Sequence, residues 1–361
     1  MATLREKIGQ MFMVGLGGEE LTQEEKHLLI DYPFGGFILF KHNLREPKQI
    51  LSLCRVLWES KKALSPFIAI DQEGGRVHRL PASFTHFPPA AAVGRTGKSD
   101  LALRVGEATA RELSAVGINL NFAPVLDVNS NPKNPVIGDR SLSSDPSEVT
   151  RLGGSIIQGL RGGGVIPCAK HFPGHGDTFQ DSHIELPVVK KERALLESVE
   201  LPPFVHACRN GVETLMTAHV LYPALDASAP ATLSRRILAD LLRGELAYDG
   251  VVFGDDLEMQ AISNNYPLEE AVTLTVNAGV DVLMFCHETA NSVAAFDFLR
   301  KQAEKSEQMK TRVEESYQRI KKLKQRYLRS FAGVGENLLT EHIGITTHQK
   351  LAEEISKTRE Y

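Results

Sequence analysis

The chain has 361 residues, of which 42% are hydrophobic and 24% are charged, as in an ordinary soluble globular protein. The formal net charge of −4 gives no reason to expect a polyanion, so we predict no nucleic acid partner. No stretch approaches the roughly 18 uninterrupted apolar residues of a membrane span, and the N-terminus carries no secretory h-region. We therefore predict a cytoplasmic protein without membrane contact.

Eight short apolar runs have the character of buried parallel strands, at 11–16, 36–40, 67–71, 118–123, 165–170, 214–219, 251–255 and 280–285. Helical patterns alternate with them, at 22–31, 47–62, 100–116, 146–161, 192–210, 235–246, 268–278 and 292–301. Such alternation favours right-handed βαβ units, and eight of them can close into a barrel. We predict an α/β fold, a (β/α)8 TIM barrel over residues 1–330. A doubly wound open sheet is the alternative, but no GxGxxG follows the first strand.

The sequence also predicts the structure of three further segments: a loop, a helix and a C-terminal tail. Residues 132–146, after the fourth strand, resemble an active-site loop. Residues 301–329 have apolar side chains at spacings of three and four, which predicts one amphipathic helix covering the barrel. Residues 331–361 form a tail that could dock through four apolar side chains, Leu338, Leu339, Ile343 and Ile345.

The four cysteines are expected to be buried free thiols rather than a disulfide framework. Cys54, Cys168, Cys208 and Cys286 are far apart in the sequence, and mostly lie in apolar runs.

Polar residues that end the predicted strands are candidates for chemistry, because the working residues of a parallel barrel protrude at the carboxyl ends of its strands. Six residues occupy such positions: Asp71, Asp127, Lys170, His171, His219 and Asp255. The loop after the fifth strand adds His175, Asp177, Asp181 and His183 within a few residues.

Three chemistries could use this set. A metal hydrolase could take ligands from His171, His175, Asp177 and His183, but the spacing matches no metal signature and Lys170 would place a competing cation beside the metal. A serine acyl transferase lacks its GxSxG elbow. Glycosyl transfer needs a carboxylate below an anomeric carbon and a proton donor at the leaving oxygen.

Asp255 suits the role of that carboxylate, because it ends an apolar run at the barrel mouth, and Gly254 is expected to leave room for a sugar ring. We expect Asp256 to cap the following turn. No second carboxylate stands out as the proton donor. Asp181 and His183 are two apart and face the same side of an extended segment, so the carboxylate could orient the imidazole as acid and then base.

Three long motifs, which follow one another along the chain as they do in the family, resemble the bacterial β-N-acetylhexosaminidases of glycoside hydrolase family 3. The motifs are Asp71 to Arg79, Lys170 to Thr178 followed by Asp181-Ser182-His183, and Phe253 to Met259. The resemblance implies a TIM barrel and a retaining double displacement. It implies Asp255 as nucleophile, His183 as acid/base and Asp181 as its partner, with sugar-binding positions at Asp71, Arg79, Arg140, Lys170 and His171.

The departures from the family pattern are modest. Gly254 replaces the Ser commonly found before the nucleophile. The second α/β domain of many β-glucosidases is absent from this sequence, so the loop would have to supply the acid.

The resemblance further implies cytoplasmic peptidoglycan recycling, with N-acetylglucosaminyl-β-1,4-anhydro-N-acetylmuramic acid and its peptides as substrates, and no metal or organic cofactor. The alternatives are a phosphorylase, another family 3 β-glycosidase, and a catalytically silent sugar-binding barrel. The sequence does not predict the oligomeric state.

Overall fold

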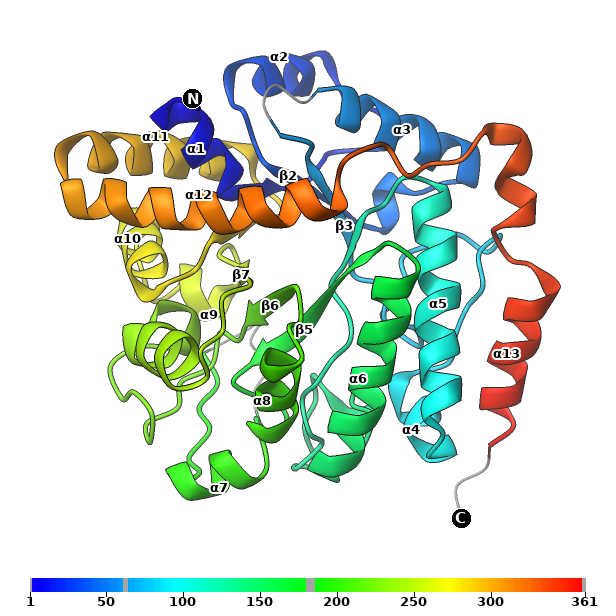
Figure 1. Ribbon diagram of the computed structural model, residues 1–361. Helices are drawn as coiled ribbons and strands as arrows, with labels where there is room; N and C mark the ends of the chain where they lie inside the picture. The colour runs from blue at the N-terminus through cyan, green and yellow to red at the C-terminus, as the bar shows by residue number, and fades with distance from the viewer. Residues whose placement is uncertain (1, 61–63, 180–185, 359–361) are drawn as a thin grey trace.

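The computed structural model describes residues 2–60, 64–179 and 186–358 (Figure 1). Eight parallel strands close into a barrel in sequence order, as predicted. The strands are β1 (Phe12–Val14), β2 (Gly36–Leu39), β3 (Phe67–Ile70), β4 (Leu120–Asn121), β5 (Ile166–Phe172), β6 (Thr214–Thr217), β7 (Val251–Asp256) and β8 (Val282–Phe285). Each predicted apolar run contains or overlaps one strand, and β4 is the most shortened relative to its prediction.

The helices surround the barrel (Figure 1). The α-helices are α1 (Leu4–Gln10), α2 (Gln23–Asp31), α3 (Pro47–Glu59), α4 (Ala90–Thr96), α5 (Ser99–Ala115), α6 (Pro146–Gly162), α7 (Arg193–Ser198), α8 (Pro202–Arg209), α9 (Gln260–Ser263), α10 (Leu268–Ala278), α11 (Thr289–Lys305), α12 (Glu307–Tyr327) and α13 (Thr346–Ser356). Short 3₁₀ turns lie at η1 (Lys41–Asn43), η2 (Gly138–Arg140), η3 (Ala231–Leu233) and η5 (Glu336–Glu341), and η4 (Arg236–Glu245) is a π-helix. In the described part of the chain, no helix has the length and hydropathy needed to cross a membrane.

Two predictions of single helices were wrong. The predicted helix 192–210 is divided into α7 and α8, because Pro202 and Pro203 cannot donate to preceding carbonyls and instead begin a new helix. The segment 301–329 is divided at Ser306, where α11 ends and the Ser306 hydroxyl caps α12 by accepting from the Met309 N–H at 3.2 Å. The predicted apolar stripe of α12 is nevertheless buried.

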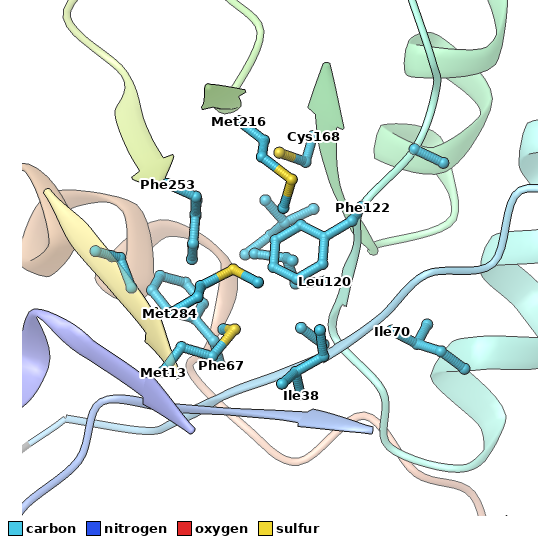
Figure 2. Packing of buried hydrophobic residues seen from close by; sticks show 14 of the residues in the cluster. Met13, Ile38, Phe67, Ile70, Leu120, Phe122, Cys168, Met216, Phe253 and Met284 are labelled. Atoms are coloured by element: carbon cyan, nitrogen blue, oxygen red, sulfur yellow. The ribbon is translucent and has the colours of Figure 1, made fainter. Parts of the chain in front are cut away.

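The interior of the barrel is filled by alternate residues of the strands (Figure 2). Phe253 of β7 packs edge-on against Phe67 of β3 and Phe122, with ring centroids 5.7 and 5.4 Å apart. Met13, Ile38, Leu120, Cys168, Met216 and Met284 fill the remaining space. Because side chains alternate between the two faces of a strand, the residue two positions beyond the last inward residue of a strand faces the mouth of the barrel.

The four cysteines are free thiols. Cys54, Cys168 and Cys286 are buried, and Cys208 is half-buried.

The C-terminal segment docks on the outside of the barrel, where α13 lies beside α5 (Figure 1). Of the four expected anchors, Leu339 and Ile343 are buried and Ile345 is half-buried, whereas Leu338 is exposed. A buried carboxylate adds a polar connection: Glu112 of α5 accepts from the Gly344 N–H at 3.1 Å and pairs with His348 Nδ1 at 2.7 Å. The same carboxylate accepts the N–H and hydroxyl of Thr85.

We predict that Glu112→Ala lowers the free energy of unfolding by about 3 kcal/mol, because it leaves several buried donors without an acceptor. Glu107→Ala, on the exposed face of the same helix, is the control and should cost less than about 0.5 kcal/mol. Urea unfolding of both variants checks this. If Glu112→Ala and Glu107→Ala unfold at the same urea concentration, the contacts of Glu112 with Thr85, Gly344 and His348 do not stabilise the fold.

Candidate functional site

A cavity of about 290 Å³ lies at the carboxyl ends of the strands. Six of the residues predicted as site residues line it: Asp71, Arg79, Arg140, Lys170, His171 and Asp255. The remaining two, Asp181 and His183, lie outside the described residues. Pro135, Val136 and Arg140 come from the 132–146 loop, which therefore contributes to the cavity as expected.

The alternation of side chains along the strands places the charged residues in this cavity. Lys170 lies two positions beyond the inward Cys168 of β5, and Asp255 lies two beyond Phe253 of β7. Asp71 follows β3 in the same relation to Ala69. Because Cys168 and Phe253 belong to the core shown in Figure 2, these polar groups lie beyond that core toward the carboxyl ends of the strands.

Two carboxylates and two cations form a neutral cluster on one wall of the cavity. Lys170 Nζ lies 2.5 Å from Asp71 Oδ1 and 2.8 Å from Glu73 Oε1. Arg140 binds Glu73 with two hydrogen bonds of 2.8 Å, one from Nε and one from Nη2. Burial raises the pKa of Glu73, but Arg140 and Lys170 outweigh burial and hold that pKa well below its usual range. Glu73 is therefore ionised, and the cluster offers fixed donors and acceptors to a polyhydroxylated ligand.

Glu73 was missed as a site residue by the sequence analysis. Its position, two residues beyond Asp71 in the same motif, was the available signal. Arg79 is a clearer ligand-binding candidate, because its Nε is buried and has no hydrogen-bond partner among the described residues.

His171 is oriented by a buried carboxylate. Asp127, which is fully buried, lies 2.7 Å from His171 Nδ1 through Oδ2, and its Oδ1 accepts the backbone N–H groups of His171 and His175. Burial raises the pKa of Asp127, but His171 and His175 outweigh it and keep that pKa below its usual value. An ionised Asp127 can only accept, so His171 Nδ1 carries the proton and Nε2 is left for a ligand.

Asp255 has the ionisation expected of a nucleophile. Its Oδ1 accepts the Asp256 N–H at 2.8 Å. Burial raises the pKa of Asp255, but the imidazoles of His219 and His171 and this backbone N–H outweigh it and hold the pKa below its usual range. The carboxylate is therefore charged at neutral pH.

The expectation that Gly254 makes room for a sugar ring was wrong. A Cβ at position 254 would meet Val280 and Thr232 side chains at 3.5 and 3.6 Å, which is ordinary contact on the side of the strand away from the Asp255 side chain. Position 254 could hold a larger residue without obstructing the cavity.

Asp256 caps the following turn, as expected, since its Oδ1 accepts the Glu258 N–H at 3.1 Å. It also lines the cavity, which was not predicted. Burial raises the pKa of Asp256 to about 6. His219 is not a lining residue, and supports this strand end from below through a 2.9 Å contact between Nε2 and the Asp256 carbonyl.

The two sides of segment 180–185 are connected through one lysine. Lys191 Nζ lies 3.3 Å from Asp177, which precedes the segment, and 2.6 Å from the buried Glu200. The use of Asp177 in this ion pair counts against its role in the alternative metal site. Within the described ranges, no group of three or more His, Cys, Asp and Glu side chains is arranged to hold a metal ion.

Comparisons with known proteins agree with this geometry. Residues 3–323 match the family described as the glycosyl hydrolase family 3 N-terminal domain. A relative, beta-hexosaminidase A of Pseudoalteromonas piscicida, is 38% identical over 362 residues, which cover 93% of this chain and 60% of the relative. The chain thus spans less than two thirds of that protein.

Two solved structures are also similar. The family 3 beta-N-acetylglucosaminidase of Paenibacillus sp. str. FPU-7 superposes with a TM-score of 0.94 at 41% identity, covering 99% of this chain and 69% of that one. NagZ from Neisseria gonorrhoeae, solved with N-trifluoroacetyl-D-glucosamine, has a TM-score of 0.78 at 30% identity, covering 96% and 97%. The barrel, the charged cavity at its mouth and these matches together establish that the chain belongs to glycosyl hydrolase family 3, a family of glycosidases.

Proposed function

We propose that the protein is an exo-acting β-N-acetylglucosaminidase that works by a retaining double displacement. The observation that carries the proposal is the ionised Asp255 at the mouth of the barrel, facing the cluster of Asp71, Glu73, Arg140 and Lys170 across one small cavity. Relatives named beta-hexosaminidase and beta-N-acetylglucosaminidase, and the N-acylated glucosamine bound by the Neisseria protein, support the sugar class.

In the proposed first step, Asp255 attacks the anomeric carbon and the leaving oxygen departs with a proton. The charged cluster, Arg79 and His171 Nε2 bind the ring hydroxyls and hold the sugar against the nucleophile. Because the charged cluster is already fixed by mutual ion pairs and His171 by Asp127, little reorganisation of these groups is needed when charge develops on the ring. In the second step, water releases the sugar from Asp255 with retention of configuration.

The proton donor in the proposal is His183, oriented by Asp181. Both residues lie outside the described ones, so the support for this assignment comes only from the family motif and from the spacing of the two residues in the sequence. Among the described carboxyl groups of the cavity, Asp256 is the competitor, because burial raises its pKa to about 6 and so keeps part of it protonated near neutral pH.

As the natural substrate we propose N-acetylglucosaminyl-β-1,4-anhydro-N-acetylmuramic acid and its peptides, hydrolysed in the cytoplasm during peptidoglycan recycling without metal or organic cofactor. The support is the resemblance to bacterial family 3 hexosaminidases, together with a cavity of a size that suits one terminal sugar.

We predict that Asp255→Ala lowers turnover at least about a thousandfold, because the covalent route is lost. Adding azide to the variant with an activated aryl N-acetylglucosaminide should restore turnover and yield the α-configured glycosyl azide, since the small anion can enter the space of the missing carboxylate. In the wild type, a 2-fluoro glycoside should label the peptide containing Asp255. Retention of more than a tenth of wild-type turnover would remove Asp255 from this role.

His183→Ala should reduce kcat/KM far more for the disaccharide than for an activated aryl glycoside, because a departing phenolate needs little protonation. Asp181→Ala should follow the same pattern more mildly. Asp256→Asn is the matched comparison, since Asn can still accept from the Glu258 N–H. If only Asp256→Asn shows the dependence on leaving group, Asp256 is the acid and the assignment of His183 is wrong.

The alternative function is a phosphorylase, since an imidazole acid/base would not repel phosphate as a second carboxylate would. We predict that the wild type releases free N-acetylglucosamine in phosphate buffer and that EDTA leaves the rate unchanged. Product analysis by mass spectrometry checks both points. Accumulation of the sugar 1-phosphate would replace the hydrolase with the phosphorylase.

A further inference from the structure

Three aromatic rings with a similar orientation follow β2 and β8, and two of them, Phe40 and His287, line the cavity. Phe40, directly after β2, has its ring centroid 6.1 Å from that of His42 and 5.9 Å from that of His287. The ring planes of His42 and His287 are inclined to that of Phe40 by only 9° and 23°. We call these three rings the aromatic platform.

Strand alternation explains why Phe40 faces the site. Ile38 lies inside the barrel, so Phe40, two positions further along, reaches the mouth in the same way as Asp255 does on β7. Phe40 lines the cavity and is half-buried, whereas the His287 side chain is 66% exposed and His42 is exposed. The platform therefore leads from the cavity out to solvent.

The loop that carries Phe40 and His42 is held rigidly by a buried amide. Asn43, which is fully buried, accepts the Phe40 N–H at 2.8 Å and donates to the carbonyls of Leu16 and Gly18. His42 Nε2 contacts the same Leu16 carbonyl at 2.9 Å, which fixes the imidazole plane.

The loop that carries His287 is held by a carboxylate. Glu258 accepts the His287 N–H at 2.7 Å, the Glu288 N–H at 3.1 Å and the Asn291 side-chain amide at 2.8 Å. Asp256 Oδ2 also lies 3.4 Å from His287 Nε2. Both supports of the platform are thus preorganised, as expected of a binding surface rather than of two loose loops.

In the proposed function, the aromatic platform does not bind the terminal sugar. That ring is served by the charged wall opposite, and a cavity of about 290 Å³ lies near the lower limit for ligand sites, so a second sugar has to lie outside it. The faces of aromatic rings are electron-rich and apolar, which suits the C–H face of a pyranose. Phe40 and His287 line the same cavity as Asp255, and His287 is exposed, so a leaving group that passes from Asp255 toward solvent on this side would contact them.

We propose that Phe40, flanked by His42 and His287, binds the leaving group, and that this leaving group is a pyranose ring stacked on Phe40. This inference rests on the proposed function. The protein would then favour glycosides in which N-acetylglucosamine is joined to another sugar over those in which it is joined to a small group.

The test compares two substrates that share the terminal sugar. One is a β-linked disaccharide with N-acetylglucosamine at its non-reducing end, and the other is N-acetylglucosaminyl β-azide, whose leaving group is too small to reach the platform. We expect Phe40→Leu to lower kcat/KM for the disaccharide about ten- to thirtyfold and that for the azide less than about threefold. Phe40→Tyr, which keeps the ring, should stay within about threefold of wild type on both.

His287→Ala provides an independent check, because an exposed side chain can be removed with little risk to folding. It should lower kcat/KM for the disaccharide about three- to tenfold and leave the azide unchanged. Equal losses on both substrates for Phe40→Leu, or a Phe40→Tyr variant as impaired as Phe40→Leu, would overturn the proposal. Failure of the wild type to cleave the azide would instead contradict the proposed function, and this inference with it.

Discussion

The alternation of side chains along eight short parallel strands is the constraint on which this molecule depends. The last residue of a strand whose side chain enters the barrel interior is followed two positions later by one that reaches the mouth. Phe253 therefore places Asp255, Cys168 places Lys170, and Ile38 places Phe40. A one-residue shift in any of these strands would turn the working side chain toward the surrounding helices, as the outward position of Gly254 illustrates.

Charge neutrality is the second constraint. The cavity wall brings together two carboxylates and two cations, of which Lys170 is buried and the other three are half-buried. The two-point contact between Arg140 and Glu73 fixes a loop after β4 to a loop after β3. Removing water from any one of these charges alone would be costly, but each is paired with groups of opposite sign at hydrogen-bond distance. The ion pairs of the cavity wall are therefore also the connections between these loops, so the geometry of the wall cannot change independently of the fold.

The sequence predicted the barrel well, because eight apolar runs separated by helical patterns leave few other topologies. It predicted helix ends less well: the stop at Ser306 depends on a single cap within a continuous amphipathic pattern. Site residues were predictable where a polar residue directly ended a strand or lay in a long motif. Glu73 was not predicted, and Asp127 was predicted only as a strand-end candidate, since their contacts are with partners far away in the sequence. No local pattern states that Arg140 lies against Glu73 or that His171 lies against Asp127. The aromatic platform was missed for the same reason, because His42 and His287 belong to loops that are far apart in the sequence.

The ion pairs of Lys191 have a consequence for how this family member can vary. Asp177 and Lys191 lie on either side of segment 180–185, and their contact, together with the buried Glu200, fixes the separation of the two chain ends that enter and leave it. The entropy cost of closing a loop grows only slowly with the number of residues in it. A change in the length of the chain between Asp177 and Lys191 would therefore alter the loop-closure entropy only slightly. None of Asp71, Glu73, Arg140 and Lys170 lies between them, so the ion pairs of the charged cluster do not depend on that stretch of sequence.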